Sequence, residues 1–288
     1  METPTRPCGA CGKEGAPRRC PCKGESYCGR GCQKVSWIVH KEKCTVHLSN
    51  VLAEKRREHG DDAAEVGAAC FMIGDVYMDQ GHYDDAEENF LETARIYRPL
   101  ERDRVFLGVG EEFPVVGVAL HMLGNVYQKQ GKYVDARKMF QDSLRIRRLF
   151  FGHEHEDVAA SLNGLGNVYM LQGKHEKAVQ KYEQALCIYH ATHGIEKVAL
   201  VLTNLGNVYQ RIGMPDRAMG NYNEALRIVR REFGSDHYSA ANTLISMANI
   251  LIKTGRLDAA LVNIQEVLPI MRRVHGKKSP QAASAIFV

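Results

Sequence analysis

The phrase Leu123-Gly-Asn-Val-Tyr127 returns at residues 165–169 and 205–209, and this recurrence decides the fold. Looser copies flank the three, Ile73-Gly-Asp-Val-Tyr77 before them and Met247-Ala-Asn-Ile-Leu251 after them. The second residues of successive phrases lie 50, 42, 40 and 42 positions apart. A recurrence near forty residues predicts stacked repeats, in which each repeat buries its apolar face against its neighbours.

Each phrase is followed at fixed distances by three further residues. A glycine comes seven residues after the second residue of the phrase, an alanine five residues later, and a large residue four after that. This pattern predicts a pair of helices, with the glycine ending the first helix in a left-handed conformation. We expect the small residue of the phrase to touch the alanine, and the large residue to fill the gap between neighbouring pairs. The large residues are Phe90, Phe140, Tyr182, Tyr222 and Ile264.

This skeleton resembles the tetratricopeptide repeat. The resemblance implies an all-α fold, an α-solenoid of helix hairpins over residues 62–288. The repeats would lie near residues 67–98, 117–150, 159–192, 199–232 and 241–274, with a partial sixth from residue 283. The usual period of the family is 34, so each unit has about eight extra residues. That longer form resembles the repeats of kinesin light chains, although the heptad coiled coil of those proteins is absent and motor association is not implied.

The extra residues follow the second helix of each pair. Gly152-x-x-His155 matches Gly234-x-x-His237 there, so the run from His153 to Asp157 is predicted to form a turn instead of a metal cluster. The first spacing is longer than the others, and Pro99, Gly108, Gly110 and Pro114 fall within it. We therefore predict an extended loop from Arg98 to Pro114.

A second signal is the crowding of cysteines near the N-terminus. Seven cysteines and one histidine stand in four pairs between Cys8 and Cys44, whereas only Cys70 and Cys187 occur elsewhere. Eight such ligands suffice for two tetrahedral zinc ions. The segment is too small to fold by apolar burial alone, so we expect the metal to hold it together.

The pair spacings, together with Tyr27, resemble the MYND zinc finger over residues 8–44. The resemblance implies two interleaved ions, which would be structural because no ligand position is left open. The first zinc ion would be held by Cys8, Cys11, Cys28 and Cys32, and the second by Cys20, Cys22, His40 and Cys44. The family usually has two residues inside the second pair, and here Pro21 alone separates Cys20 from Cys22.

Candidate peptide-binding residues recur at one position of the repeat. The residue after the small residue of each phrase is polar, and in tetratricopeptide arrays it faces the concave groove. An amide there can donate to a peptide carbonyl and accept from a peptide N–H, so a ladder of amides suits an extended backbone. The alternative is a polar residue on a wet face, repeated by duplication. The ladder consists of Asn125, Asn167, Asn207 and Asn249, with Asp75 in the first repeat.

The finger offers a second candidate surface. The MYND resemblance implies that Gln33 and Trp37 help to dock short proline-containing peptides. Trp37 is equally suited to be the core of so small a module. Between finger and repeats, residues 45–61 are predicted to form a linker helix.

The charge of the chain gives little support for nucleic-acid binding. The net charge is +4, and nine basic and four acidic residues fall within residues 1–50. Zinc-bound thiolates would offset much of that positive charge, so the dense basic face that nucleic acid needs is missing. The N-terminus lacks the apolar core of a signal peptide, and no run of 18 apolar residues suggests a membrane span. Clustered thiolates favour a reducing compartment, so we expect an intracellular protein, cytoplasmic or nuclear.

These features predict a zinc-binding protein–protein interaction adaptor, with other proteins or extended peptides as partners and no enzymatic activity. Two alternatives stay open. The chain could be a fragment of a longer MYND-containing protein methyltransferase, although helical residues 45–288 leave no room for a β-rich methyl-donor domain. It could also be a nucleic-acid-associated transcriptional co-regulator, which salt-dependent binding to duplex DNA would reveal.

Overall fold

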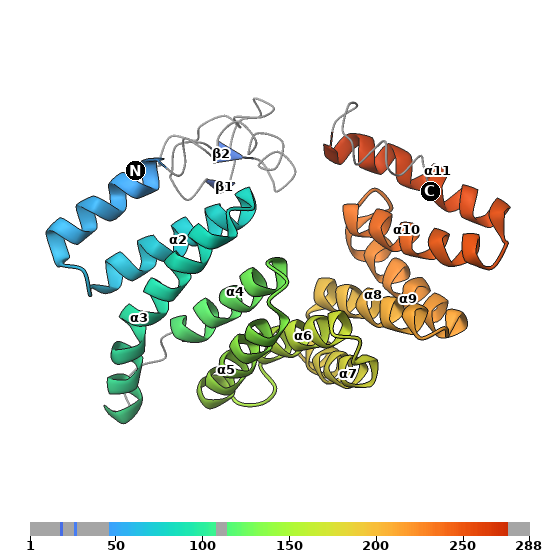
Figure 1. Cartoon of the computed structure of the whole chain (residues 1–288). Coiled ribbons are helices and arrows are strands. Elements are labelled where there is room, and N and C mark those ends of the chain that lie inside the picture. Colours follow the sequence, from blue (N-terminus) through green and yellow to red (C-terminus); the bar gives the residue numbers. More distant parts are fainter. Residues whose placement is uncertain (1–17, 20–25, 28–45, 108–113, 276–288) are drawn as a thin grey trace. The chain divides into compact units, whose positions relative to one another are not determined.

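The computed structural model describes residues 18–19, 26–27, 46–107 and 114–275, and its helices form successive antiparallel pairs (Figure 1). The predicted all-α class, helix hairpins of the solenoid type, is confirmed. A helix over residues 46–59 precedes the pairs. Two-residue strands, β1 (Arg18–Arg19) and β2 (Ser26–Tyr27), pair antiparallel in the finger segment. The pairs are α2 (Ala64–Gln80) with α3 (Tyr83–Leu107), α4 (Val115–Lys129) with α5 (Tyr133–Phe151), α6 (Glu156–Leu171) with α7 (His175–Ala191), α8 (Ile195–Arg211) with α9 (Pro215–Phe233), and α10 (Tyr238–Lys253) with α11 (Leu257–His275).

The chain divides into two compact units, Met1–Ile146 and Arg147–Val288. In the first unit, the buried side chains of Phe90 on α3 and Leu123 on α4 belong to one apolar cluster. In the second unit, α8 contacts both α6 and α10, so the first helices of three successive pairs lie side by side. No helix within the described ranges is long and apolar enough to cross a membrane.

The glycine that ends each first helix adopts the predicted left-handed conformation. Gly81, for example, has φ 80° and donates its N–H to the carbonyl of Met78. Gly131, Gly173, Gly213 and Gly255 have φ values between 72° and 77°. A side chain at this φ is strained, which explains why glycine recurs at the position.

The small residue of the phrase has a different neighbour from the one that the sequence suggested. A Cβ atom added to Gly166 would lie 2.5 Å from Cε1 of Tyr182, and one added to Gly124 would lie 2.8 Å from Cε1 of Phe140. The ring therefore lies on the glycine of its own helix pair. This contact of the ring with the glycine was not predicted, whereas the expected packing of the large residue against the next pair is found for Phe90, which clusters with residues of α4.

The helix α3 also differs from the prediction, because it continues through Pro99 to Leu107. The predicted loop is therefore wrong for residues 98–107. A proline costs a helix one backbone hydrogen bond, but the leucine, glutamate and arginine residues that follow are good helix formers. Residues 108–113 lie outside the described ranges, and Pro114 is the N-cap of α4.

His155 is a helix cap, in agreement with the predicted turn. Its Nδ1 accepts a hydrogen bond from the backbone N–H of Asp157 at 3.2 Å, at the start of α6. Its ring stacks on Phe151 at a centroid distance of 4.0 Å. His237 repeats both contacts at the start of α10, with Ser239 N–H at 3.3 Å and Phe233 at 4.8 Å. These caps satisfy backbone donors that a helix start leaves unpaired.

Replacing His155 by alanine is expected to lower the free energy of unfolding by about 0.5–2 kcal/mol, because the cap acceptor is lost. His155→Asn keeps an acceptor and should recover most of that loss. The exposed His153 in the same loop provides the control, since His153→Ala removes no such contact. Urea titration of the three variants measures the effect, and equal losses for His155→Ala and His153→Ala would contradict the capping role.

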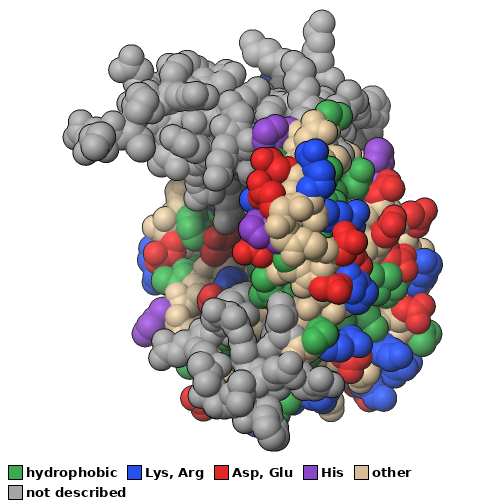
Figure 2. Space-filling model, turned by 90° about the vertical axis from the view of Figure 1, so that its left-hand side faces the viewer, with side chains coloured by type: hydrophobic (Ala, Val, Ile, Leu, Met, Phe, Trp, Pro, Cys, Tyr) green, Lys and Arg blue, Asp and Glu red, His purple; other side chains and the backbone are tan. Residues whose placement is uncertain are grey.

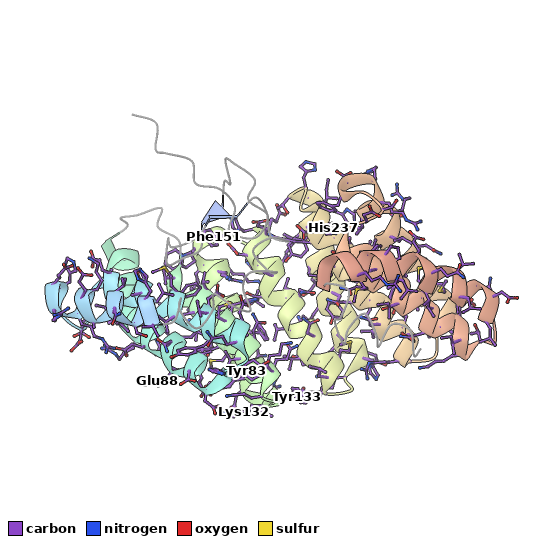
Figure 3. The ribbon with its side chains drawn as sticks, turned by 90° about the horizontal axis from the view of Figure 1, so that it is seen from above. Tyr83, Glu88, Lys132, Tyr133, Phe151 and His237 are labelled. Atoms are coloured by element: carbon purple, nitrogen blue, oxygen red, sulfur yellow. The ribbon has the colours of Figure 1, made fainter. Side chains whose placement is uncertain are left out.

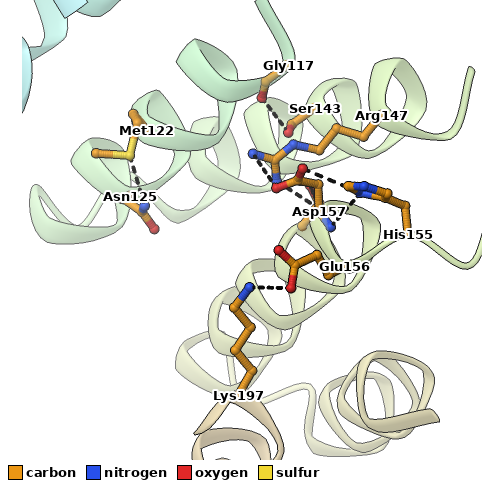
Figure 4. Close-up of polar contacts among 10 residues, drawn as sticks. Gly117, Met122, Asn125, Ser143, Arg147, His155, Glu156, Asp157 and Lys197 are labelled. Atoms are coloured by element: carbon orange, nitrogen blue, oxygen red, sulfur yellow. Dashed lines mark hydrogen bonds and ion pairs between the residues drawn. The ribbon is translucent and has the colours of Figure 1, made fainter. Parts of the chain in front are cut away.

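Arg147 joins the end of α5 to the start of α6 inside the second unit (Figure 4). Its side chain is buried, with 3% of the residue exposed. Nη1 donates to the carbonyl of Asp157 at 2.9 Å and to Oγ of Ser161 at 3.0 Å, while Nη2 lies 3.9 Å from Oδ1 of Asp157. Burial lowers the pKa of Arg147, against the opposing effect of Asp157, but a guanidinium remains charged in proteins. The cation is thus matched by three oxygen atoms.

Candidate peptide-binding face

The four asparagines of the predicted ladder occupy the same position on successive first helices. Asn125 lies on α4 in the first unit, and Asn167, Asn207 and Asn249 lie on α6, α8 and α10 in the second. All four are half-buried, whereas Asp75 on α2 is exposed. Because α6, α8 and α10 are neighbours, the second unit presents three of these amides on adjacent helices.

The amide of Asn167 is held by two donors. The hydroxyl of Tyr182 on α7 donates to Oδ1 at 2.6 Å, and Nδ2 of Asn204 on α8 approaches the same oxygen at 3.4 Å. Nδ2 of Asn204 also donates to Oδ1 of Asn163 at 3.1 Å. Nδ2 of Asn167 has no hydrogen-bond partner among the residues that the structure describes.

The tyrosine contact recurs at Asn207 one repeat later. The hydroxyl of Tyr222 on α9 donates to its Oδ1 at 2.7 Å and lies 3.3 Å from Oε1 of Gln210. Burial raises the pKa of Tyr222 to about 12, and it also raises the pKa of Tyr182. Both phenols therefore stay protonated at neutral pH and remain donors. Within the described ranges, Nδ2 of Asn207 likewise has no partner.

The other two asparagines lack this tyrosine. Phe140 occupies the equivalent position beside Asn125, whose Nδ2 lies 3.8 Å from Sδ of Met122 (Figure 4). Ile264 is the equivalent residue of the last pair, and Asn249 forms no hydrogen bond with described residues. Sequence reasoning missed Tyr182 and Tyr222 as partners of the ladder. The signal was the change from phenylalanine to tyrosine at the large position in the third and fourth repeats.

Polar side chains form hydrogen bonds across the junction between α3 and α4 in the first unit. The hydroxyl of Tyr127 donates to Glu87 at 2.8 Å, and Nε2 of Gln130 donates to Asp84 at 2.8 Å. Lys132 lies 3.4 Å from Glu87. Figure 3 shows Lys132 close to Tyr83 and Tyr133. We call Asp84, Glu87, Tyr127, Gln130 and Lys132 the polar junction.

The carboxyl of Glu87 is the centre of this polar junction. Partial burial opposes its ionisation, but hydrogen bonds from Tyr127 and Gln130 and the charge of Lys132 outweigh burial and lower the pKa of Glu87. Burial and the hydrogen bond to Glu87 raise the pKa of Tyr127 to about 12. The ionised carboxylate is therefore the form that the junction stabilises.

This lowered pKa makes the stability of the chain depend on pH at Glu87. A carboxyl with a depressed folded-state pKa contributes stability above its unfolded pKa, about 4.3, and loses it as pH falls through the lower folded value. Glu87→Gln should therefore be less stable than the wild type at pH 7, with a smaller difference at about pH 3.5, below the unfolded pKa. Glu88→Gln is the control, because Glu88 is exposed. Urea titrations at both pH values measure this, and a pH-independent difference would exclude the mechanism.

At the corresponding junction between α7 and α8 in the second unit, apolar side chains replace three of the polar ones. Val179, Ile212 and Met214 stand where the polar junction has Glu87, Gln130 and Lys132. A pocket of about 730 Å³ opens there, lined also by Tyr209 and by Arg217, whose guanidinium lies 5.7 Å from the centre of the Tyr209 ring. The two junctions show that the repeats share their internal contacts but differ in how they meet.

All predicted zinc ligands lie outside the described residues: Cys8, Cys11, Cys20, Cys22, Cys28, Cys32, His40 and Cys44. Gln33 and Trp37 lie outside them as well. The described part of the finger is the β1–β2 pair, in which Arg18 is opposite Tyr27 and Arg19 opposite Ser26. Thiolate and imidazole donors fit zinc chemically. The described ranges contain no cluster of three or more metal-binding side chains, and the run from His153 to Asp157 is no exception.

The repeated hairpins define a class of protein, a helical-repeat protein. Residues 116–190 and 197–273, more than half of the 288, match the tetratricopeptide repeat family model, and residues 67–98 match a second model of that repeat. The chain belongs to the tetratricopeptide repeat family. Residues 8–44 match the MYND finger, so the predicted order of finger and repeats is confirmed.

Solved structures share the repeat fold. BtubC (BKLC) from P. vanneervenii aligns with a TM-score of 0.65 at 22% identity, over 83% of this chain and 94% of its own. A Podospora anserina protein with kinesin light chain TPR-like repeats gives 0.55 at 20%, over 74% and 97%. The apo form of RapI gives 0.61 at 15%, over 84% and 81%. At these identities the similarity shows the fold alone, and the expected likeness to kinesin light chain repeats holds at that level.

Proposed function

We propose that this chain is a non-catalytic adaptor that binds extended polypeptide segments along the asparagines of its repeat helices. The observation that carries the proposal is the recurrence of half-buried asparagines on three adjacent first helices, with the Nδ2 groups of Asn167 and Asn207 free of described partners. An Nδ2 group that no side chain occupies can donate to the backbone carbonyl of a bound segment. Membership of the tetratricopeptide and MYND families supports a protein-interaction role.

The binding residues in this proposal are Asn125, Asn167, Asn207 and Asn249. Contacts to backbone groups would make recognition tolerant of side-chain sequence, which suits an adaptor with several partners. Figure 2 shows acidic and basic side chains interspersed on the face in view, which gives no reason to prefer nucleic acid as the partner. We infer that the chain catalyses no reaction. A reducing compartment, the cytoplasm or nucleus, suits it because thiolate ligands would persist there.

The test uses the tightest dodecapeptide selected from a random display library against the intact chain. We expect replacement of Asn125, Asn167 and Asn207 by alanine to weaken its binding at least tenfold, about 1.4 kcal/mol. The control carries Gln180→Ala and Asn223→Ala, which remove exposed polar groups from second helices. Fluorescence anisotropy gives both affinities, and an unchanged dissociation constant in the asparagine variant would overturn the groove as the binding site.

For the finger, we propose two structural zinc ions and a docking surface that includes Gln33 and Trp37. The support is the eight-ligand set of residues 8–44 and the MYND match. One ion would be bound by Cys8, Cys11, Cys28 and Cys32, and the other by Cys20, Cys22, His40 and Cys44. Pro21 alone separates Cys20 from Cys22, so Cys20 is the proposed ligand that most needs a direct test.

Metal analysis of the purified chain is expected to give about two zinc ions per molecule. Cys28→Ser should remove one ion, because it breaks one ligand set and leaves the other intact. Cys20→Ser should likewise remove one if Cys20 is a ligand. A wild-type content near one would contradict the second site, and Cys20→Ser with both ions retained would remove Cys20 from the ligand set.

A further inference from the structure

We propose that Tyr182 is a positioning residue that fixes Asn167 as a hydrogen-bond donor. Asn167 would then bind backbone carbonyls of a bound peptide and not its N–H groups. The inference rests on the proposed function. The expected partner is an extended segment that needs no backbone N–H where it contacts Asn167. Proline, which has no N–H, would therefore be tolerated at that position.

The oxygen of Asn167 is already used. An amide oxygen has two lone pairs, and here one accepts from the Tyr182 hydroxyl at 2.6 Å and the other faces Nδ2 of Asn204 at 3.4 Å. A phenol can also accept, so the tyrosine alone would not identify the atom. In the structure, both the Tyr182 hydroxyl and Nδ2 of Asn204 approach Oδ1 of Asn167. What remains for a ligand is the two N–H bonds of Nδ2.

Asn207 shares the tyrosine contact, but the described residues offer its oxygen no second donor, so only Asn167 has both lone pairs of its oxygen occupied. The oxygen of Asn207 accepts from Tyr222 at 2.7 Å, and the same hydroxyl lies 3.3 Å from Gln210. Tyr182 and Tyr222 are both fully buried, and each ring rests on the glycine of its own pair. A buried ring packed against a helix backbone cannot change its rotamer, so its hydroxyl stays in place and holds the asparagine amide in one orientation.

The first unit contains the natural comparison. Asn125 has Phe140 in place of the tyrosine, and its Nδ2 turns to Met122 instead of remaining free. Phe140 is as fully buried as Tyr182 and Tyr222, so phenylalanine is compatible with the fold at this position. Loss of the hydroxyl therefore changes the amide without requiring a change in the helix pair.

The experiment is a double-mutant cycle with the selected dodecapeptide as the probe. Tyr182→Phe is expected to weaken binding about 3- to 10-fold, the usual worth of one hydrogen bond. In the Asn167→Ala background the same change should have no effect, because Tyr182 acts only through Asn167. Phe140→Tyr should strengthen binding through Asn125. Thermal unfolding of each variant confirms that the fold is retained.

Modified peptides test the direction of the hydrogen bonds. Each backbone N–H of the probe is replaced in turn by N–CH₃, and each product is bound to the wild type and to Asn167→Ala. Where an N–CH₃ group weakens binding to the wild type, we expect it to weaken binding to Asn167→Ala by the same factor. A penalty that does disappear would mean that Asn167 accepts from that N–H, which would overturn the inference.

The outcomes separate the two proposals. If Asn167→Ala and Asn207→Ala leave the affinity unchanged, the proposed binding site itself is wrong. If these variants weaken binding but Tyr182→Phe weakens it equally in both backgrounds, the tyrosine has a structural role only and the inference alone is wrong.

Discussion

Gly166→Ala is expected to lower the free energy of unfolding by about 1–3 kcal/mol, the usual cost of overpacking a buried site. A loss of stability would be informative, because alanine in a helix interior normally stabilises the helix by about 1 kcal/mol relative to glycine. The new Cβ would lie 2.5 Å from the Tyr182 ring. That ring is fully buried and its hydroxyl is bound to Asn167, so it has no space to retreat.

Two further variants decide whether the ring is the cause. Gly220 on α9 has open space around it, so Gly220→Ala should stabilise the chain by about 0.5–1 kcal/mol. The last pair combines Ala248 with Ile264, which suggests that Gly166→Ala with Tyr182→Ile relieves the clash. Urea titration should show a favourable coupling energy in that double mutant. If the losses of the two single variants simply add in the double mutant, contact with the Tyr182 ring does not cause the destabilisation.

Arg147→Ala is expected to be more damaging, at about 2–5 kcal/mol, because it removes a large buried side chain together with its hydrogen bonds. The loss would leave the Asp157 carbonyl and the Ser161 hydroxyl without their strongest donor and open a cavity beside α6. Arg147→Met fills that volume without a charge and should recover part of the loss.

Arg145→Ala is the matched control for Arg147→Ala, since Arg145 is an exposed arginine two residues earlier on the same helix. A change within about 0.5 kcal/mol is expected there. Urea titration of the three variants provides the comparison. Similar losses at positions 145 and 147 would show that the buried hydrogen bonds of Arg147 do not support the fold.

Much of the fold could be predicted because its signals are local. A glycine with positive φ, such as Gly81, is constrained by its own backbone, and the repeat then shows the same constraint five times. The partner of Gly166 was harder, because Ala178 and Tyr182 lie one turn apart on the same helix. Spacing alone does not tell which of the two faces the glycine. The continuation of α3 beyond Pro99 was missed because proline weakens a helix without always ending it.

The candidate site was predictable in position and not in orientation. The period placed Asn167 and Asn207 on equivalent faces, but their hydrogen bonds join α6 to α7 and α8 to α9 across tertiary contacts. We expected each amide to donate and accept at once. The occupied oxygen of Asn167 shows that a neighbouring side chain can remove one of those capacities. Equal residues in a repeat are therefore not equal in chemistry.

The contrast between the polar junction and its counterpart between α7 and α8 has a consequence for how the protein responds to salt. Sodium chloride screens the pairing of Lys132 with Glu87, whereas Val179, Ile212 and Met214 carry no charge to screen. Added NaCl should therefore weaken the side-chain contacts of the polar junction and leave those of its counterpart nearly unchanged. Backbone amides near Lys132 should exchange their hydrogens slightly sooner as NaCl is added, by a small factor because the ion pair is partly exposed. Sensitivity to salt is thus a local property of one repeat boundary.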